Sequence, residues 1–338
     1  MTQIKAFELR NNNGAKASVI NYGARLTALI IPTQKYGNIN TILAYEHNEQ
    51  YKLDPMFHGA IAGPVCNRIA DGKYHVGQQL FQTEKNEGNN TLHSGSQGLH
   101  QKYWRLVEHD NNSITLEVTL FCSESGFPGN ISISLTYTLL DSNSLQIKWS
   151  AISDKITPLS LTNHSYFNLA GFGDIKSHLL HIPAKLYTPI NEEQIPTGEI
   201  AKVENSIFDL RKFTTVSSIL DSNEPEIIRW GGLDHNWLYE YSQKPTLQAQ
   251  LYSPDSHLLL QIESTLPGLQ CYTGNQLAVF GIHGTHEGIC LEPQFPPNAV
   301  NQHNFPSCLL PKNKRVMQQI NFNFSEISTE QFNQIKDQ

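Results

Sequence analysis

The chain has 338 residues, of which 39% are hydrophobic and 16% charged, enough apolar material for a large core and too little charge for a disordered chain. The formal net charge of −7, without any run rich in Lys and Arg, argues against nucleic acid or an anionic membrane as a partner. No stretch approaches the roughly 18 apolar residues of a membrane span. Five widely spaced cysteines lack the C-x-x-C spacing of metal and redox sites. We therefore expect a globular cytoplasmic protein with reduced thiols.

Alternation of apolar and polar residues indicates strands along the whole chain. In chain order, the stretches with this strand pattern cover residues 17–31, 114–120, 131–139, 145–149, 247–252, 258–263 and 316–324. Clusters of Gly, Pro, Asn and Asp separate them, as turns require. A helical pattern is favoured only at residues 328–336. The sequence therefore predicts an all-β fold.

The chain shows no internal repeat, low-complexity tract or linker that would divide it. Because β-sandwiches often exceed about 200 residues, we expect one domain that spans residues 1–338. Residues 56–100 and 284–307 alternate little and are rich in Gly, Asn, His and Pro. Long ordered loops usually carry function, so we expect functional residues in these two segments.

The common nucleotide, protease and hydrolase motifs are absent, including GxGxxG, GxxxxGK[ST], HExxH and GxSxG. Residues 161–171, LTNHSYFNLAG, interrupt the alternation with polar groups between aromatic ones, which suits a cleft that binds a sugar. His164 is the candidate for chemistry in this segment. An equally ordinary interpretation is a core histidine that caps a turn.

A set of short motifs, in one order along the chain, resembles the aldose 1-epimerase (galactose mutarotase) family. Segment 161–171 resembles its signature, and the other motifs are NRI at 67–69, NEGNNTLHSG at 86–95, GLDHN at 232–236, LPGLQCYTGN at 266–275, LEPQ at 291–294, NAVN at 298–301 and NFPS at 304–307. The resemblance extends from about residue 21 to near residue 310. Each motif alone is weak, but the ordered set is specific. It implies a large antiparallel β-supersandwich with an open cleft, in agreement with the strand pattern.

The resemblance also implies an enzyme, an aldose 1-epimerase or mutarotase, that interconverts the α and β anomers of a free hexose such as galactose or glucose. Opening the ring requires a base that takes the C1 hydroxyl proton and an acid that protonates the ring oxygen. Carried over from the family, the base is Glu292 and the acid is His164. The reaction implied is free of metal and of any other cofactor.

Substrate positioning is assigned by the same resemblance to Arg68, His93 and Asp234, whose side chains can bond vicinal hydroxyls. Each also has a structural alternative. Arg68 fits a surface salt bridge, Asp234 fits the cap of a turn, and His93 fits a loop histidine bonded to backbone.

Asn67, Tyr166 and Gln294 are weaker candidates for contacts with the sugar, because packing or loop hydrogen bonds explain them equally well. Glu292 could likewise be an ordinary carboxylate of an edge strand. The proline-rich segment after it, residues 293–298, favours the end of a functional strand instead.

Three positions depart from the family's usual pattern. Ser94 stands where glycine is usual, Pro293 where threonine is common, and Asn298 where aspartate is common. None of these changes removes a proposed catalytic group. They put the substrate preference in doubt more than the type of reaction.

Three other functions stay open. A hexose-phosphate mutarotase would need clustered cations for the phosphate, and apart from Arg68 the cleft segments show no cluster of Arg and Lys. A non-catalytic carbohydrate-binding module would be expected to lack the acid or the base. A glycoside hydrolase or lyase would use paired carboxylates, whereas the candidates here are one Glu and one His. In the favoured interpretation the partner is a monosaccharide, and the protein is a monomer or homodimer.

Overall fold

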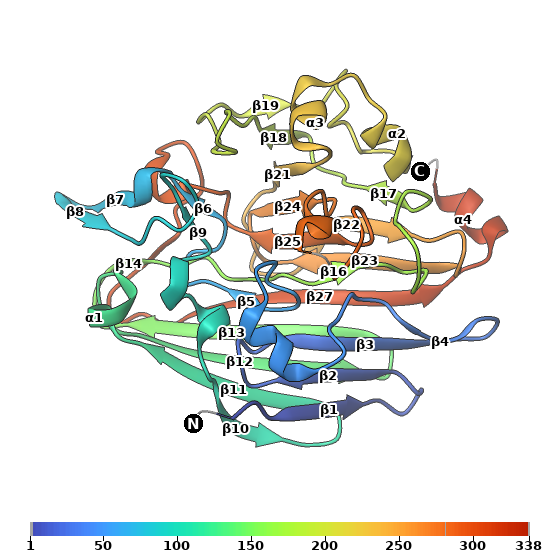
Figure 1. Ribbon diagram of the computed structural model, residues 1–338, viewed down its shortest axis with the longest axis horizontal. Coiled ribbons are helices and arrows are strands. Elements are labelled where there is room, and N and C mark those ends of the chain that lie inside the picture. Colours follow the sequence, from blue (N-terminus) through green and yellow to red (C-terminus); the bar gives the residue numbers. More distant parts are fainter. Residues whose placement is uncertain (1–2, 281, 337–338) are drawn as a thin grey trace.

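The computed structural model of the protein describes residues 3–280 and 282–336 (Figure 1). Its largest element is a nine-stranded antiparallel sheet, whose strands in spatial order are β10 (Arg105–His109), β11 (Ser113–Leu120), β12 (Ile131–Leu140), β13 (Ser144–Ser153), β27 (Val316–Glu326), β23 (Leu258–Ser264), β22 (Thr246–Tyr252), β17 (Leu179–His181) and β20 (Thr214–Thr215). Strands β11 to β13 form a meander, because each pairs with its successor in sequence. Strand β12 illustrates why these residues form strands with one buried face, because they alternate between buried and more exposed along its length.

A second antiparallel sheet has six strands, in the order β16 (Tyr166–Phe167), β25 (Ile289–Gln294), β24 (Gly268–Tyr272), β21 (Asp234–Leu238), β18 (Leu186–Thr188) and β19 (Ala201–Lys202). A third sheet is a four-stranded meander of β1 (Ala6–Arg10), β2 (Lys16–Ile20), β3 (Leu26–Thr33) and β4 (Gly37–Asn40). The three sheets share one main apolar core, in which Leu29, Leu135 and Leu291 represent one sheet each. The aromatic rings of Phe167 and Phe322, 5.1 Å apart, join the six-stranded sheet to the nine-stranded one.

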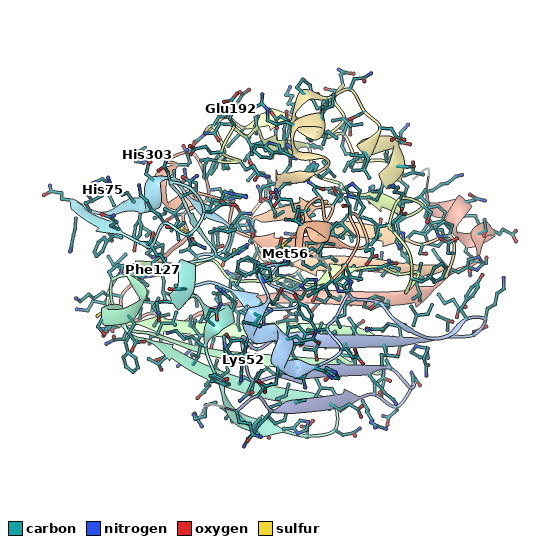
Figure 2. The ribbon with its side chains drawn as sticks, in the orientation of Figure 1. Lys52, Met56, His75, Phe127, Glu192 and His303 are labelled. Atoms are coloured by element: carbon teal, nitrogen blue, oxygen red, sulfur yellow. The ribbon has the colours of Figure 1, made fainter. Side chains whose placement is uncertain are left out.

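Short elements connect the sheets. The paired strands are β14 (Thr157–Pro158) with β26 (Leu309–Leu310), β15 (Thr162–Asn163) with β5 (Ile61–Ala62), β6 (Arg68–Ile69) with β9 (Thr91–Leu92), and β7 (Lys73–Val76) with β8 (Gln79–Gln82). The α-helices are α1 (Cys122–Ser125), α2 (Val216–Leu220), α3 (Pro225–Trp230) and α4 (Thr329–Ile335). The 3₁₀ helices are η1 (Asn48–Leu53), η2 (Ala70–Gly72), η3 (Gly95–Gln97), η4 (Leu99–Gln101), η5 (Leu277–Phe280) and η6 (Ala299–Asn301). Figure 2 shows side chains filling the space between the ribbons.

The prediction of an all-β fold with large antiparallel sheets is confirmed. The predicted strand region 17–31 is two strands, because the chain turns at Gly23 and Ala24, which both have positive φ. The predicted C-terminal helix is α4, and the structure shows that the side chain of Ser328 caps it. Within residues 3–280 and 282–336, no helix combines the length and the apolar character needed to cross a membrane.

The two segments expected to be loops contain more regular structure than the sequence pattern indicates. Residues 56–100 include β5 to β9, and residues 284–307 include β25. All six residues of β25 are buried, so neither face of this short strand is exposed to solvent, and its polar residues face the cavity side. The interpretation of these segments as loops was therefore wrong in part.

Candidate active site

A cavity of about 210 Å³ lies beside the six-stranded sheet. Its walls come from that sheet, from β6 and β9, and from residues 55–57. Seven of the eight site residues predicted from the sequence line it, namely Asn67, Arg68, His93, His164, Tyr166, Asp234 and Glu292. Gln294 is the one that does not. The fold thus collects residues from motifs that are far apart in the chain.

Strand β25 carries Glu292 to the cavity because successive strand residues point to opposite faces of a sheet. Leu291 lies in the main core, while Glu292 lines the cavity. Glu292 pairs with Gln270 of β24, and only 3% of its surface is exposed. Since β16 and β24 flank β25 on its two sides, this residue is not the carboxylate of an edge strand.

The Glu292 carboxylate has few partners in its buried position. Its Oε2 atom accepts no hydrogen bond from the described residues. Its Oε1 atom lies 3.9 Å from Nε2 of His164, which is beyond hydrogen-bond distance. Burial, and secondly the nearby charge of Asp234, hold the pKa of Glu292 well above its usual range. When ionised, this carboxylate is a stronger base than an exposed glutamate.

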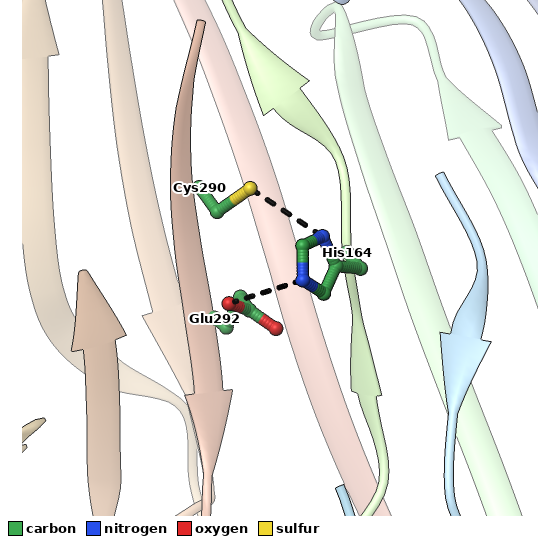
Figure 3. A group of neighbouring side chains, drawn as sticks. All are labelled: His164, Cys290 and Glu292. Carbon is green, nitrogen blue, oxygen red and sulfur yellow. Dashed lines mark hydrogen bonds and ion pairs between the residues drawn. The ribbon is translucent and has the colours of Figure 1, made fainter. Parts of the chain in front are cut away.

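His164 lies between β15 and β16, and the backbone holds it in place. Its N–H donates to the carbonyl of Ala60 at 2.9 Å, and its carbonyl accepts from the N–H of Gly59 at 2.9 Å. Figure 3 shows its two ring nitrogens facing β25, with Nδ1 3.5 Å from the sulfur of Cys290 and Nε2 toward Glu292. Burial lowers the pKa of His164 to about 4.

Burial thus favours the neutral form of both members of the pair, a protonated Glu292 and an uncharged His164. This state holds the same number of protons as an ionised Glu292 beside a protonated His164. When the carboxylate is ionised, its charge 3.9 Å away favours the imidazolium. Moving one proton from Glu292 to His164 therefore turns the neutral pair into a base, the carboxylate, and an acid, the imidazolium.

Arg68 of β6 is a buried residue and not a surface one, since only 6% of its surface is exposed. Its Nε and Nη2 atoms donate to the two carboxylate oxygens of Glu87 at 2.7 and 2.8 Å. Nη2 also donates to Oε1 of Gln194 at 2.8 Å, and Nη1 lies 3.5 Å from Oδ2 of Asp234. The planar guanidinium is fixed by these bonds, as a group that positions a ligand must be.

Asp234 begins β21 and is held by two amide side chains. Gln270 donates to its Oδ1 at 2.6 Å, and Gln194 donates to its Oδ2 at 2.7 Å. Both amides and Glu87 were missed by the sequence analysis. Gln270 and Glu87 lie within the recognised motifs 266–275 and 86–95, so their positions were a usable signal. Gln194 lies outside every motif, and nothing in the sequence marks it.

His93 is fixed by the backbone of Asn67, and both residues have positive φ. The N–H of Asn67 donates to Nδ1 of His93 at 3.1 Å, so neutral His93 carries its hydrogen on Nε2. Burial, followed by the charge of neighbouring His164, holds the pKa of His93 well below its usual range. His93 therefore remains a neutral hydrogen-bond donor at pH 7.

Tyr166 and Gln294 occupy different environments. Tyr166 is 1% exposed, lines the cavity and packs against the ring of His164 at 5.2 Å. Gln294 accepts a hydrogen bond from the thiol of Cys66 at 3.2 Å and is fully buried. The structure therefore places Tyr166 within reach of a ligand and Gln294 behind the cavity wall.

Proton transfer on a small molecule with many hydroxyls is the chemistry that this cavity supports, because a buried acid–base pair faces amide, carboxylate and guanidinium groups. Together with the antiparallel sheets, it defines the protein as an enzyme that acts on a carbohydrate.

The chain belongs to the aldose 1-epimerase family, whose sequence model matches residues 5–323. Galactose mutarotase of pig (Sus scrofa) is 34% identical over 91% of this chain and 90% of its own length. Aldose 1-epimerase of Escherichia coli (strain K12) is 31% identical over 88% of each chain. The crystal structure of an aldose epimerase homologue from C. elegans matches with a TM-score of 0.88 and 26% identity, covering 96% of this chain and 100% of the other.

These comparisons confirm the predicted family, the fold of the galactose mutarotase type and the predicted enzyme class, an aldose 1-epimerase that isomerises a sugar. The roles of individual residues stay predictions, which the geometry of the cavity supports.

Proposed function

We propose that this enzyme interconverts the α and β anomers of a free hexose, galactose or glucose, with Glu292 and His164 as its proton-transfer pair. The observation that carries the proposal is the buried approach of Nε2 of His164 to Oε1 of Glu292 at 3.9 Å on the cavity wall. Neither group is tied to the other by a hydrogen bond at that distance. Both are free to bond the two oxygens of a hemiacetal.

The reaction begins when Glu292 takes the proton of the C1 hydroxyl and His164 gives a proton to the ring oxygen. The bond between C1 and the ring oxygen breaks, and C1 becomes an aldehyde. Rotation about the C1–C2 bond presents the other face of the aldehyde to the C5 hydroxyl. The ring then closes as Glu292 returns its proton to the C1 oxygen and His164 takes the hydroxyl proton. The pair ends with the proton count with which it began.

Arg68, His93 and Asp234 hold the sugar hydroxyls in this proposal. Arg68 and His93 supply donors, and Asp234 supplies acceptors. The guanidinium of Arg68 is already paired with Glu87 and lies 3.5 Å from Asp234. Because its charge is compensated, this site favours a neutral hexose over a hexose phosphate.

The test is polarimetry of freshly dissolved α-D-galactose and α-D-glucose, with wild-type protein and the variants Glu292→Gln and His164→Asn. We expect each variant to lower the catalysed rate by about 10²- to 10⁴-fold, the range for losing one general acid or base. Matched controls are Glu192→Gln and His75→Asn, two exposed residues marked in Figure 2, which should retain the wild-type rate.

Circular dichroism of each variant checks that it is folded. A folded wild type that accelerates neither sugar would contradict the proposed substrate, and hexose phosphates would then be measured in the same way. A Glu292→Gln or His164→Asn variant as fast as wild type would contradict the assigned role of that residue.

A further inference from the structure

The thiol of Cys290 lies beside the proposed proton-transfer pair, although ring opening does not require it. Cys290 and Glu292 are two residues apart on β25, so they face the same side of the strand. Together with His164 they form a group whose ligating atoms all lie within 4.8 Å of one another (Figure 3). The sulfur is 3.5 Å from Nδ1 of His164.

The spacing of these atoms is close to that of a metal complex. With bonds of about 2.0–2.3 Å, the ligand atoms around tetrahedral zinc are about 3.3–3.7 Å apart. The approach of sulfur to the imidazole at 3.5 Å already matches this range. The ligating atoms of the group lie within 4.8 Å, so the carboxylate must move by about 1 Å to complete the set, and among the described residues its Oε2 atom has no hydrogen bond to break.

The types of donor select the cation. A thiolate, an imidazole and a carboxylate suit zinc and other thiophilic divalent ions, whereas magnesium and calcium prefer oxygen ligands alone. Two members of the group, His164 and Glu292, line the cavity, so an ion can enter from solvent and keep water in its fourth position. The neighbouring carboxylate of Asp234, which also lines the cavity, adds favourable charge.

We propose that Cys290, His164 and Glu292 form a binding site for a thiophilic divalent cation, Zn²⁺ or Cd²⁺, and that the bound ion inhibits the enzyme. On binding, two protons go to solvent, one from the Cys290 thiol and one from the Glu292–His164 pair, so that the ligands are a thiolate, a carboxylate and a neutral imidazole; no oxidation state changes. The spacing of cysteines along the chain gave no sign of a metal site, because the group forms only when β25 and the segment after β15 meet. The inhibition rests on the proposed function, whereas the binding does not.

Cd²⁺ alone is the probe for binding, because a cadmium–thiolate bond adds a charge-transfer band in the ultraviolet that histidine and carboxylate ligands do not give. Cys122 is exposed, so the titration uses a Cys122→Ser background. We expect a band of single-thiolate intensity in that background and its loss in Cys290→Ser. Cys271→Ser is the matched control, since Cys271 is a buried thiol of the main core on the neighbouring strand β24. The band should persist there.

Glu292→Gln in the same background provides a variant that keeps the thiol. We expect it to bind Cd²⁺ at least about tenfold more weakly, because one ligand has lost its charge. A band absent from the Cys122→Ser protein, or one that persists in Cys290→Ser, would overturn the proposal.

Activity gives the second readout. We expect Zn²⁺ to inhibit mutarotation in competition with the sugar, and a chelator to restore it. In Cys290→Ser, the fraction of that variant's own rate lost at the same Zn²⁺ concentration should be smaller by about tenfold or more. Equal inhibition of both proteins would contradict the site. A cadmium band from a protein that accelerates no sugar would support the metal site and contradict the proposed function instead.

Discussion

Asp234 and Glu292 are two acidic side chains of one cavity, carried by strands of the same sheet with β24 between them. After burial, the charge of Asp234 is the second cause that raises the pKa of Glu292. Replacing Asp234 by Asn removes that charge and keeps the shape, so the pKa of Glu292 should fall toward its usual range. A base with a lower pKa stays ionised to lower pH.

The expected result for Asp234→Asn is therefore a shift of the acid limb of the pH profile of kcat/KM to lower pH. The height of the profile should drop as well, because a substrate contact is lost. Polarimetric rates from pH 4 to 9 measure both effects. An acid limb that stays in place or moves to higher pH would show that Asp234 does not act on Glu292 through its charge.

Ser94 occupies a backbone conformation with φ of 68°, which favours glycine. Its hydroxyl offsets the strain, since it accepts from the N–H of Val65 and donates to the carbonyl of Val65, both at 2.9 Å. Ser94→Ala keeps the strain and loses both bonds, whereas Ser94→Gly also relieves the strain. We expect the alanine variant to be less stable than the glycine variant by about 1 kcal/mol.

Urea unfolding of both variants beside wild type measures this difference. An alanine variant as stable as the glycine variant would mean that the left-handed backbone is not strained. The result matters for the site, because Ser94 directly follows His93 and holds the cavity segment to Val65.

The proposed catalytic and binding residues could be predicted from the sequence where they lie in motifs, but the residues that hydrogen-bond to them could not. Glu292, His164 and Arg68 were found because their motifs occur in a specific order. The amide of Gln194, which bonds both Arg68 and Asp234, comes from a segment without any motif. Such a partner is specified by the folded geometry alone.

The segment from Asp54 to His58, which places Met56 and Phe57 at the cavity, is fixed by a buried ion pair. Nη1 of Arg25 lies 2.6 Å from Oδ2 of Asp54, with both side chains fully buried. Asp54 also accepts from the backbone N–H of Met56 at 2.9 Å. Burial alone would raise the pKa of Asp54, but the hydrogen bond of His58 and the charges of Arg25 and His58 outweigh it and hold the pKa below the usual range.

We expect Asp54→Asn to destabilise the protein at pH 7 by about 3–5 kcal/mol, since it leaves Arg25 buried without its counter-ion. Because the pKa of Asp54 is lower in the folded than in the unfolded state, wild type holds this stabilisation above the unfolded value of about 3.9 and loses it as the pH falls further. The difference between the two proteins should therefore narrow below about pH 4. Urea unfolding at pH 7 and pH 3.5 measures it, and a constant difference would contradict the role of the ionised carboxylate.

Strands with one solvent-exposed face could be predicted from the alternation in the sequence, whereas fully buried strands and very short helices could not. Strand β12 has one half-exposed face, so its alternation was visible in the sequence and its bounds were nearly correct. Strand β25 is buried throughout and has only six residues, ICLEPQ, so its alternation is too short to stand out in the sequence. Helices α2 and α3 span only five and six residues, too short for a helical period to emerge. The end of a strand at Glu292 was predicted, but Pro293 and Gln294, which were assigned to the segment after it, also belong to β25.

At the scale of the whole molecule, the cavity depends on contacts between distant parts of the chain. Cys66 and Gln294 are in hydrogen-bond contact although 228 residues separate them in sequence. Composition and alternation identified the fold class, but they contain no information on such pairings. The ordered motifs supplied it only through resemblance to proteins whose chains already fold in this way.

The Oε2 atom of Glu292, which accepts no hydrogen bond from the part of the chain that the structure describes, has a consequence for the stability of the protein. A buried oxygen without a donor weakens the folded state, and a bound hydroxyl would supply that donor. We therefore expect galactose or glucose to raise the midpoint of thermal unfolding, with a stabilisation of about 2.7 kcal/mol at a hundredfold excess over Kd. Calorimetry with the sugar against an equal concentration of sorbitol, which has no hemiacetal, measures it. Equal midpoints would contradict the expectation.

If the midpoint rises, the sugar is more than the molecule that the enzyme converts. The bound sugar supplies a hydrogen bond that the buried carboxylate of Glu292 lacks, so the enzyme with sugar unfolds less readily than the enzyme without it. A cell rich in hexose would then keep more of this enzyme intact, because its substrate protects it from unfolding.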